Sequence, residues 1–239
     1  MWHASFLLLL VTLPQQDDLR GFLTKAQRAD EAGNYQEAKK ILDTAVKIEP
    51  KSPAIYSLRG AVHFKLGKIP ESLADFDQQI VLKPSDAPAH WRRGLTLYYA
   101  EKFVEGVAQF TTSDKAEPED VENAVWHLLC NARVKGLEAA RKEMLKVNQD
   151  SRVPMMEVYK LFAGNSTIEK VMAAAEAGSP MTAEKQSRLF YAHLYCGLFA
   201  EMNQQPDRSS ELISQAVKKY PIKHYMMNVA EVHLKLRKR

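Results

Sequence analysis

The chain has 239 residues, of which 46% are hydrophobic and 26% are charged. This composition is that of an ordinary globular protein and argues against a largely disordered chain. The formal net charge is +4, but residues 218–239 hold seven Lys or Arg against Glu231 alone, so the rest of the chain is slightly acidic. Such a short basic end is a weak signal for an anionic partner, and it also suits a solvated helix end. Because no basic stripe runs along the chain, we predict no specific nucleic-acid partner.

Residues 1–16 contain no acidic or basic side chain and include the nine-residue run SFLLLLVTL. The length of this run suits the hydrophobic region of a signal peptide and is too short for a membrane-spanning helix. We therefore predict a signal peptide over 1–16 and an exported chain, periplasmic or secreted, with no transmembrane span. No Lys or Arg precedes the run and no clean cleavage motif precedes Asp17, so a misassigned start or an uncut interfacial anchor is the alternative. The chain would then be cytoplasmic or membrane-associated.

Two consecutive segments align residue by residue at an offset of 34: IYSLRGAVHFKLGKIPESLADFDQQIVLKP and AHWRRGLTLYYAEKFVEGVAQFTTSDKAEP. The aligned pairs include Gly60 and Gly94, Phe76 and Phe110, and Pro84 and Pro118. A small residue inside a first helix lets a second helix approach closely, and a proline beyond the second helix cannot continue it. The pattern predicts helix-turn-helix repeats over 19–52, 53–86 and 87–120.

The pattern weakens after Pro118 and later returns. Residues 121–152 predict a degenerate fourth helix pair, which completes a repeat array over 17–152. Residues 153–183 depart from the pattern and predict a helical insertion of two shorter helices. The period reappears in 184–239 as a C-terminal repeat, followed by a last helix over 223–237 whose polar outer side would cap the stack.

These repeats resemble the tetratricopeptide repeat (TPR) superfamily over roughly residues 19–221. The segment IYSLRGAVHFKLGKIPESLADFDQQIVLKP looks like TPR proteins exported by bacteria. The block LFYAHLYCGLFAEMNQQPDRSSELISQAVKKYP is similar to the last repeats of bacterial TPR lipoproteins that act as protease adaptors. The resemblance implies an all-α, right-handed superhelical solenoid with a C-terminal capping helix and a protein-binding role. Unlike those lipoproteins, the chain has no lipid-accepting cysteine near its N-terminus.

In a TPR solenoid the first helix of each repeat lines a concave groove, and here those positions are rich in Trp, Tyr and Arg, the residue types of binding hot spots. The predicted protein-binding groove residues are Phe64, Lys65, Trp91, Arg92, Leu95, Tyr98, Tyr99, Trp126, Arg133, Tyr191 and Tyr195. The alternative is that some of these aromatics pack under the insertion helices over 155–177, which would close the groove. Of the five positions with which TPR domains clamp the carboxylate of chaperone tails, only Arg92 fits. Leu23, Gln27, Leu58 and Pro88 occupy the others.

Enzyme signatures are missing from the sequence: there is no P-loop, G-x-G-x-x-G, HExxH or G-x-S-x-G. His90 and His193 fall at packing positions of their repeats, so we expect them in the core. We predict no catalytic residue, no metal site and no cofactor. Cys130 and Cys196 lie within helical patterns and predict buried free thiols, with a disulfide as the alternative if their helices meet.

The sequence therefore predicts a noncatalytic protein-protein interaction module. As an adaptor or assembly factor, it would hold a peptide or protein segment in its concave groove. The alternative is a self-associating structural scaffold that forms a homodimer, and an enzyme is the least favoured class.

Overall fold

A computed structural model describes residues 15–178 and 182–237 of the chain, and the described part is helical, with no strand. The helices are α1 (Gln15–Glu31), α2 (Tyr35–Ile48), α3 (Pro53–Lys65), α4 (Ile69–Leu82), α5 (Trp91–Tyr99), α6 (Phe103–Ala116), α7 (Val121–Lys135), α8 (Leu137–Lys142), α9 (Met155–Phe162), α10 (Ile168–Glu176), α11 (Thr182–Met202), α12 (Pro206–Lys219) and α13 (Tyr225–Arg237), with a short 3₁₀ helix at Pro84–Asp86. Most of the predicted signal peptide, residues 1–14, lies outside the described residues. Within them, no helix has the length and apolar character needed to cross a membrane.

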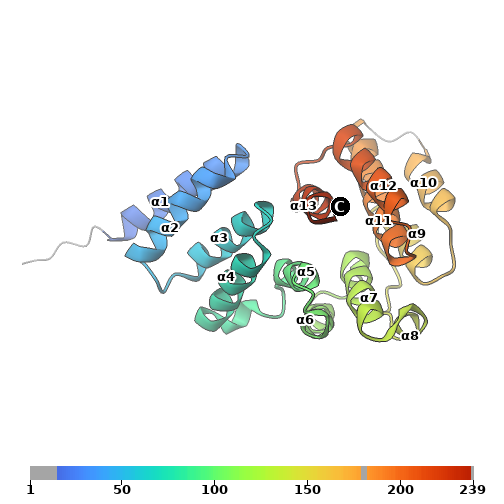
Figure 1. Ribbon diagram of the computed structural model, residues 1–239, viewed down its shortest axis with the longest axis horizontal. Helices are drawn as coiled ribbons and strands as arrows, with labels where there is room; N and C mark the ends of the chain where they lie inside the picture. The colour runs from blue at the N-terminus through green and yellow to red at the C-terminus, as the bar shows by residue number, and fades with distance from the viewer. Residues whose placement is uncertain (1–14, 179–181, 238–239) are drawn as a thin grey trace, which may run out of the picture.

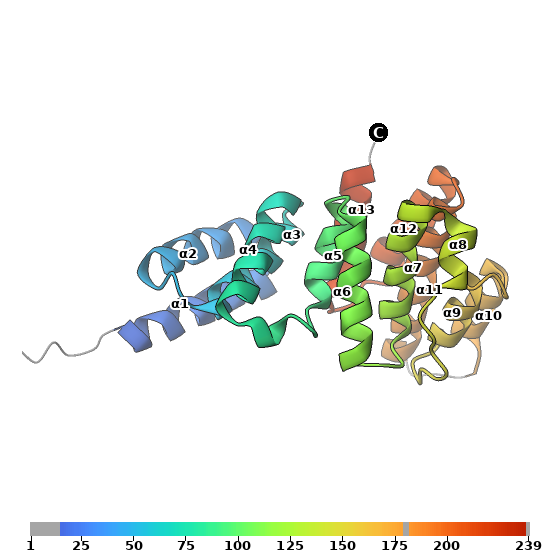
Figure 2. The same cartoon turned by 90° about the horizontal axis from the view of Figure 1, so that it is seen from below.

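The helices form hairpins that follow one another around an arc (Figure 1). Helix α1 packs on α2, α3 on α4, α5 on α6 and α11 on α12, and neighbouring hairpins contact through α2–α3, α4–α5 and α6–α7. The view from below shows the same row of hairpins (Figure 2). The predicted all-α solenoid of helix-turn-helix repeats is confirmed.

The repeated glycine and phenylalanine meet inside each hairpin. A Cβ added to Gly60 would lie 2.8 Å from the ring of Phe76, and one added to Gly94 would lie 2.6 Å from the ring of Phe110. Both phenylalanine rings are buried. The 34-residue offset in the sequence therefore corresponds to one contact made twice, where a missing side chain on the first helix admits a ring from the second.

Helices α9 and α10 fall within the predicted insertion. They pack on α7 and α11, between the fourth helix pair and the last hairpin. The ring of Phe162 on α9 lies 6.5 Å from that of Tyr195 and 5.5 Å from that of Phe199, both on α11. Thr167 caps α10 by accepting a hydrogen bond from the backbone N–H of Lys170. The insertion thus covers Tyr195 but does not extend over the rest of the predicted groove.

The two cysteines are not paired. Cys130 on α7 and Cys196 on α11 are both free and fully buried. Burial raises the pKa of each thiol to about 12, which keeps both in the unreactive protonated form.

Helix α13 lies on the inner side of the arc. It packs against α12, as a capping helix should, and it also reaches α3 across the concave side. In Figure 1 it appears end-on inside the curve of the hairpins. Its buried residues are Met226, Val229, Ala230, Val232 and His233.

Candidate protein-binding groove

The predicted groove residues do converge on one region, but most of them are covered. Six are buried, four are partly buried and Arg133 is exposed. The buried ones are Phe64, Leu95, Tyr98, Tyr99, Trp126 and Tyr195, and the partly buried ones are Lys65, Trp91, Arg92 and Tyr191. The helix that covers most of them is α13, whereas the sequence offered the insertion as the alternative cover. A partner that bound these buried aromatics would have to move α13.

Tyr225, the first residue of α13, sits among groove side chains. Its ring centroid lies 5.5 Å from that of Phe64 and 5.3 Å from that of Trp91, the second pair nearly perpendicular. The guanidinium carbon of Arg92 lies 5.3 Å from the Tyr225 ring and 5.1 Å from the Trp91 ring. Burial raises the pKa of Tyr225, so this phenol stays neutral.

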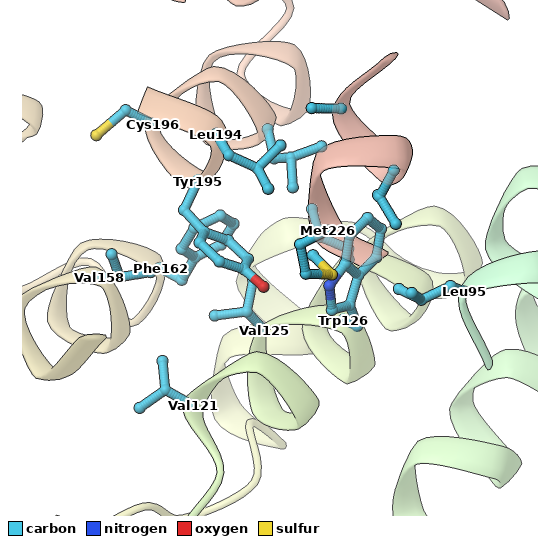
Figure 3. Close-up of a cluster of buried hydrophobic side chains, with 14 of the residues drawn as sticks. Leu95, Val121, Val125, Trp126, Val158, Phe162, Leu194, Tyr195, Cys196 and Met226 are labelled. Carbon is cyan, nitrogen blue, oxygen red and sulfur yellow. The ribbon is translucent and has the colours of Figure 1, made fainter. Parts of the chain in front are cut away.

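Met226, the next residue, faces Trp126 and Leu95 (Figure 3). All three are buried, and all three line one small cavity of about 210 Å³ together with Trp91. The remaining lining residues are Phe110, Glu117, Asp120, Glu122, Asn123 and His224. This cavity therefore has aromatic walls and an acidic rim.

Arg152 moderates the acidity of that rim. Its guanidinium bonds Asp120 at 2.6 Å and Glu122 at 2.7 Å, and Glu122 also accepts a 2.6 Å hydrogen bond from the phenol of Tyr195. Burial raises the pKa of Glu122, and the charge of Arg152 opposes that shift. Tyr195 thus serves as a buried structural donor.

Beyond Met226, polar contacts to two helices and one turn hold α13 in place. Asn228 donates to the phenol oxygen of Tyr35 at 2.9 Å, and Lys235 donates to the backbone carbonyl of Leu66 at 2.7 Å. Arg237 binds Glu201 on α11 at 2.6 Å. The helix therefore connects the N-terminal hairpins with the C-terminal hairpin.

One part of the concave side remains open. A cavity of about 620 Å³ lies between the N-terminal hairpins and α13. Its lining residues are Asp30, Glu31, Tyr35, Lys65, Arg92, Ile222, Lys223, His224, Tyr225, Met227, Asn228 and Glu231. Lys65 is already paired with Asp30 at 2.6 Å, so its charge is neutralised.

Arg92 differs from Lys65, the paired cation of this wall. It has no carboxylate within ion-pair distance among the described residues, and its buried Nε has no hydrogen-bond acceptor there. It is held between the Trp91 and Tyr225 rings and borders both the 620 Å³ cavity and a neighbouring one of about 320 Å³. A fixed guanidinium of this kind is suited to a carboxylate or carbonyl oxygen.

The histidines named in the sequence are structural. His90 Nε2 lies 2.8 Å from the side-chain oxygen of Gln79, and the backbone N–H of Arg93 donates to His90 Nδ1. His193 is buried beside Tyr220, with ring centroids 5.0 Å apart. Within the described ranges, no group of three or more His, Cys, Asp or Glu could hold a metal ion.

Sequence reasoning missed the contribution of α13 to the groove. We expected the last helix, over 223–237, to cap the stack with its polar outer side. The aromatic and methionine residues of its first turn add an apolar face, whose presence was visible in the sequence. The sequence does not show that this face points into the concave side.

Comparisons with known proteins agree with the helix-turn-helix repeats. Residues 23–88 match the family model described as "Tetratricopeptide repeat". The Hsp70-Hsp90 organizing protein of Triticum aestivum is 30% identical over 88 residues, which are 37% of this chain and 15% of that protein. The chain spans less than a fifth of the length of the curated relatives it matches.

Solved structures resemble nearly the whole chain. A tetratricopeptide repeat protein from Parabacteroides merdae ATCC 43184 superposes with a TM-score of 0.58 at 14% identity, covering 94% of this chain and 86% of that one. MamA (residues 41 to the end) from Desulfovibrio magneticus RS-1 gives 0.52 at 15% identity, covering 84% and 94%. At such identities the likeness shows the fold alone.

Proposed function

We propose that this tetratricopeptide repeat protein binds a peptide or protein segment in its concave groove, without catalysis. It would act as an adaptor or assembly factor, because such repeats form protein-protein interaction modules. The observation that supports this most is Arg92, a cation held by two aromatic rings beside open cavities, with no acidic partner among the described residues. The segment would lie on the concave face of the N-terminal hairpins and place an acidic or carbonyl group on Arg92.

The likeness to the wheat protein supports the class of function and not its partner. That protein's name refers to Hsp70 and Hsp90, but Arg92 alone fits the chaperone-tail clamp in this chain. We therefore propose a different segment as the ligand. Export remains part of the proposal and rests on the apolar run before α1.

The test is a crosslinking pulldown from the native compartment, followed by titration of the crosslinked segment. We expect Arg92→Gln to weaken binding of that segment by more than ~1 kcal/mol. Arg208→Gln, on the outer helix α12, is the matched control and should bind like the wild type. Equal affinity of the Arg92 variant and the control would contradict the proposal. Concentration-dependent sedimentation of the wild type tests the alternative, a homodimeric scaffold.

A further inference from the structure

The first turn of α13 contains one buried polar atom without a hydrogen-bond partner and packs near two more. Arg92 Nε, Trp126 Nε1 and the phenol oxygen of Tyr225 are buried and have no hydrogen-bond partner among the described residues. Buried polar groups in folded proteins are normally paired, and an unpaired one costs its desolvation free energy. Three such atoms around one helical turn indicate that the first turn of α13 fills the space between the hairpins but leaves these polar atoms without hydrogen bonds.

Open space lies on both sides of the same turn. The 620 Å³ cavity borders Tyr225, the 210 Å³ cavity borders Met226, and His224 lines both. The residues that join α12 to α13, 220–224, are not helical. Cavities thus flank this turn, and a non-helical segment connects it to α12. Both features would allow α13 to detach from the groove.

We propose that α13 is an exchangeable occupant of the groove, and that the competing partner is an amphipathic helix of another protein. This helix would present an aromatic residue followed by methionine in its first turn, an acceptor side chain beside them and a cation ten residues further on. The inference rests on the proposed function, because it names the partner's chemistry for the same groove.

The contacts of α13 define that pattern. Tyr225 and Met226 show what fills the space between Phe64, Trp91 and Trp126, and Lys235 shows that the carbonyl of Leu66 takes a cation. Ten residues of helix span about 15 Å, which sets the distance between the two anchor points. An acceptor in the first turn would add a hydrogen bond, to Arg92 Nε or Trp126 Nε1, that α13 does not make.

The test uses a labelled peptide with the sequence of residues 222–237, and the full-length protein. Lys235→Glu removes the donor to Leu66 from an exposed position and should populate the open groove. Lys219→Glu makes the same charge change on the exposed end of α12 and is the control. Apparent affinity scales with the open fraction, so we expect the Lys235 variant to bind the peptide at least about fivefold more tightly than the control. Asn228→Ala, which removes the donor to Tyr35, should act in the same direction.

Two readouts separate α13 exchange from other binding. Hydrogen exchange in residues 225–237 of the protein should rise when the peptide binds, and a peptide with Tyr225→Ala and Met226→Ala should not bind. Binding without faster exchange, or equal binding by the two charge variants, would overturn the proposal. Dimerisation of the Lys235 variant by exchange of α13 would also overturn it, because the groove would then belong to a second copy. A crosslinked segment that depends on Arg92 but is not displaced by the peptide would leave the proposed function standing while this inference fails.

Discussion

The phenol oxygen of Tyr99 on α5 lies 3.2 Å from Nδ1 of His233 on α13, although 134 positions separate the two residues. Both side chains are buried, and His233 Nε2 lies 3.7 Å from a carboxylate oxygen of Glu201 on α11. This contact joins the third repeat to the last helix through two buried side chains. The docking of α13 therefore depends on the protonation state of one histidine.

Acid should loosen this contact. Burial lowers the pKa of His233 to about 4; Glu201 opposes the shift and Arg237 adds to it. In the unfolded chain the ring would titrate near 6.5, so the neutral ring favours the folded state, and this stability is lost as the pH falls from 6.5 towards 4. The limiting loss is about 3 kcal/mol. We expect the free energy of unfolding in urea to fall less between pH 7.5 and pH 4.5 in His233→Gln than in the wild type. Identical losses in the two proteins would show that His233 does not control the docking.

The repeated glycine should resist even a methyl group. In Gly94→Ala the new Cβ would lie 2.6 Å from the Phe110 ring, so one helix must shift, at a cost of about 1–3 kcal/mol. Shortening the opposing side chain in Gly94→Ala with Phe110→Leu should return part of that loss. The control is Gly21→Ala on α1, where a Cβ meets nothing within 4 Å and alanine should stabilise the helix by up to about 1 kcal/mol. Thermal melts of the three variants measure these differences, and a neutral Gly94→Ala would contradict the close-approach argument.

The sequence predicted the repeats because their cause is local and periodic. Gly94 and Phe110 lie within one hairpin, so a 34-residue offset suffices to find their contact. The cover over the groove was not predictable in the same way. Tyr99 meets His233, and Phe64 meets Tyr225, across more than a hundred residues, and the path of α13 after Pro221 depends on how far the whole array curves. Position counting therefore identified residues that lie together on the concave side but could not tell that most of them are buried.

The first two repeats should depend on one buried ion pair. Arg59 on α3 donates to both carboxylate oxygens of Asp75, at 3.0 and 2.7 Å, and to Asp43 of the preceding hairpin at 3.1 Å. Asp75 is buried, so Arg59→Met would leave a desolvated carboxylate and should cost about 3 kcal/mol. Adding Asp75→Asn should recover part of the loss. Lys39→Met, which breaks a more exposed pair on α2, should cost at most about 0.5 kcal/mol. Urea titrations of the wild type and the three variants give these losses, and equal losses for Arg59→Met and Lys39→Met would rule out the burial argument.

Trp91 and Tyr99 should separate binding from stability. Both were predicted groove residues, but Tyr99 is buried against Phe64, Trp126 and His233, whereas Trp91 is partly buried and borders two cavities.

Tyr99→Ala should therefore lower the free energy of unfolding by about 3 kcal/mol, because it leaves a cavity and removes the hydrogen-bond partner of His233. Trp91→Ala removes the ring that supports Arg92 and should weaken binding of the crosslinked segment by more than ~1 kcal/mol, with a smaller effect on the melt than Tyr99→Ala. Circular dichroism melts and segment titrations on both variants test this separation. The contradicting outcome is that Trp91→Ala loses as much stability as Tyr99→Ala and that its binding loss follows only from unfolding. Trp91 would then belong to the core, and Arg92 would lack the support on which the proposed groove depends.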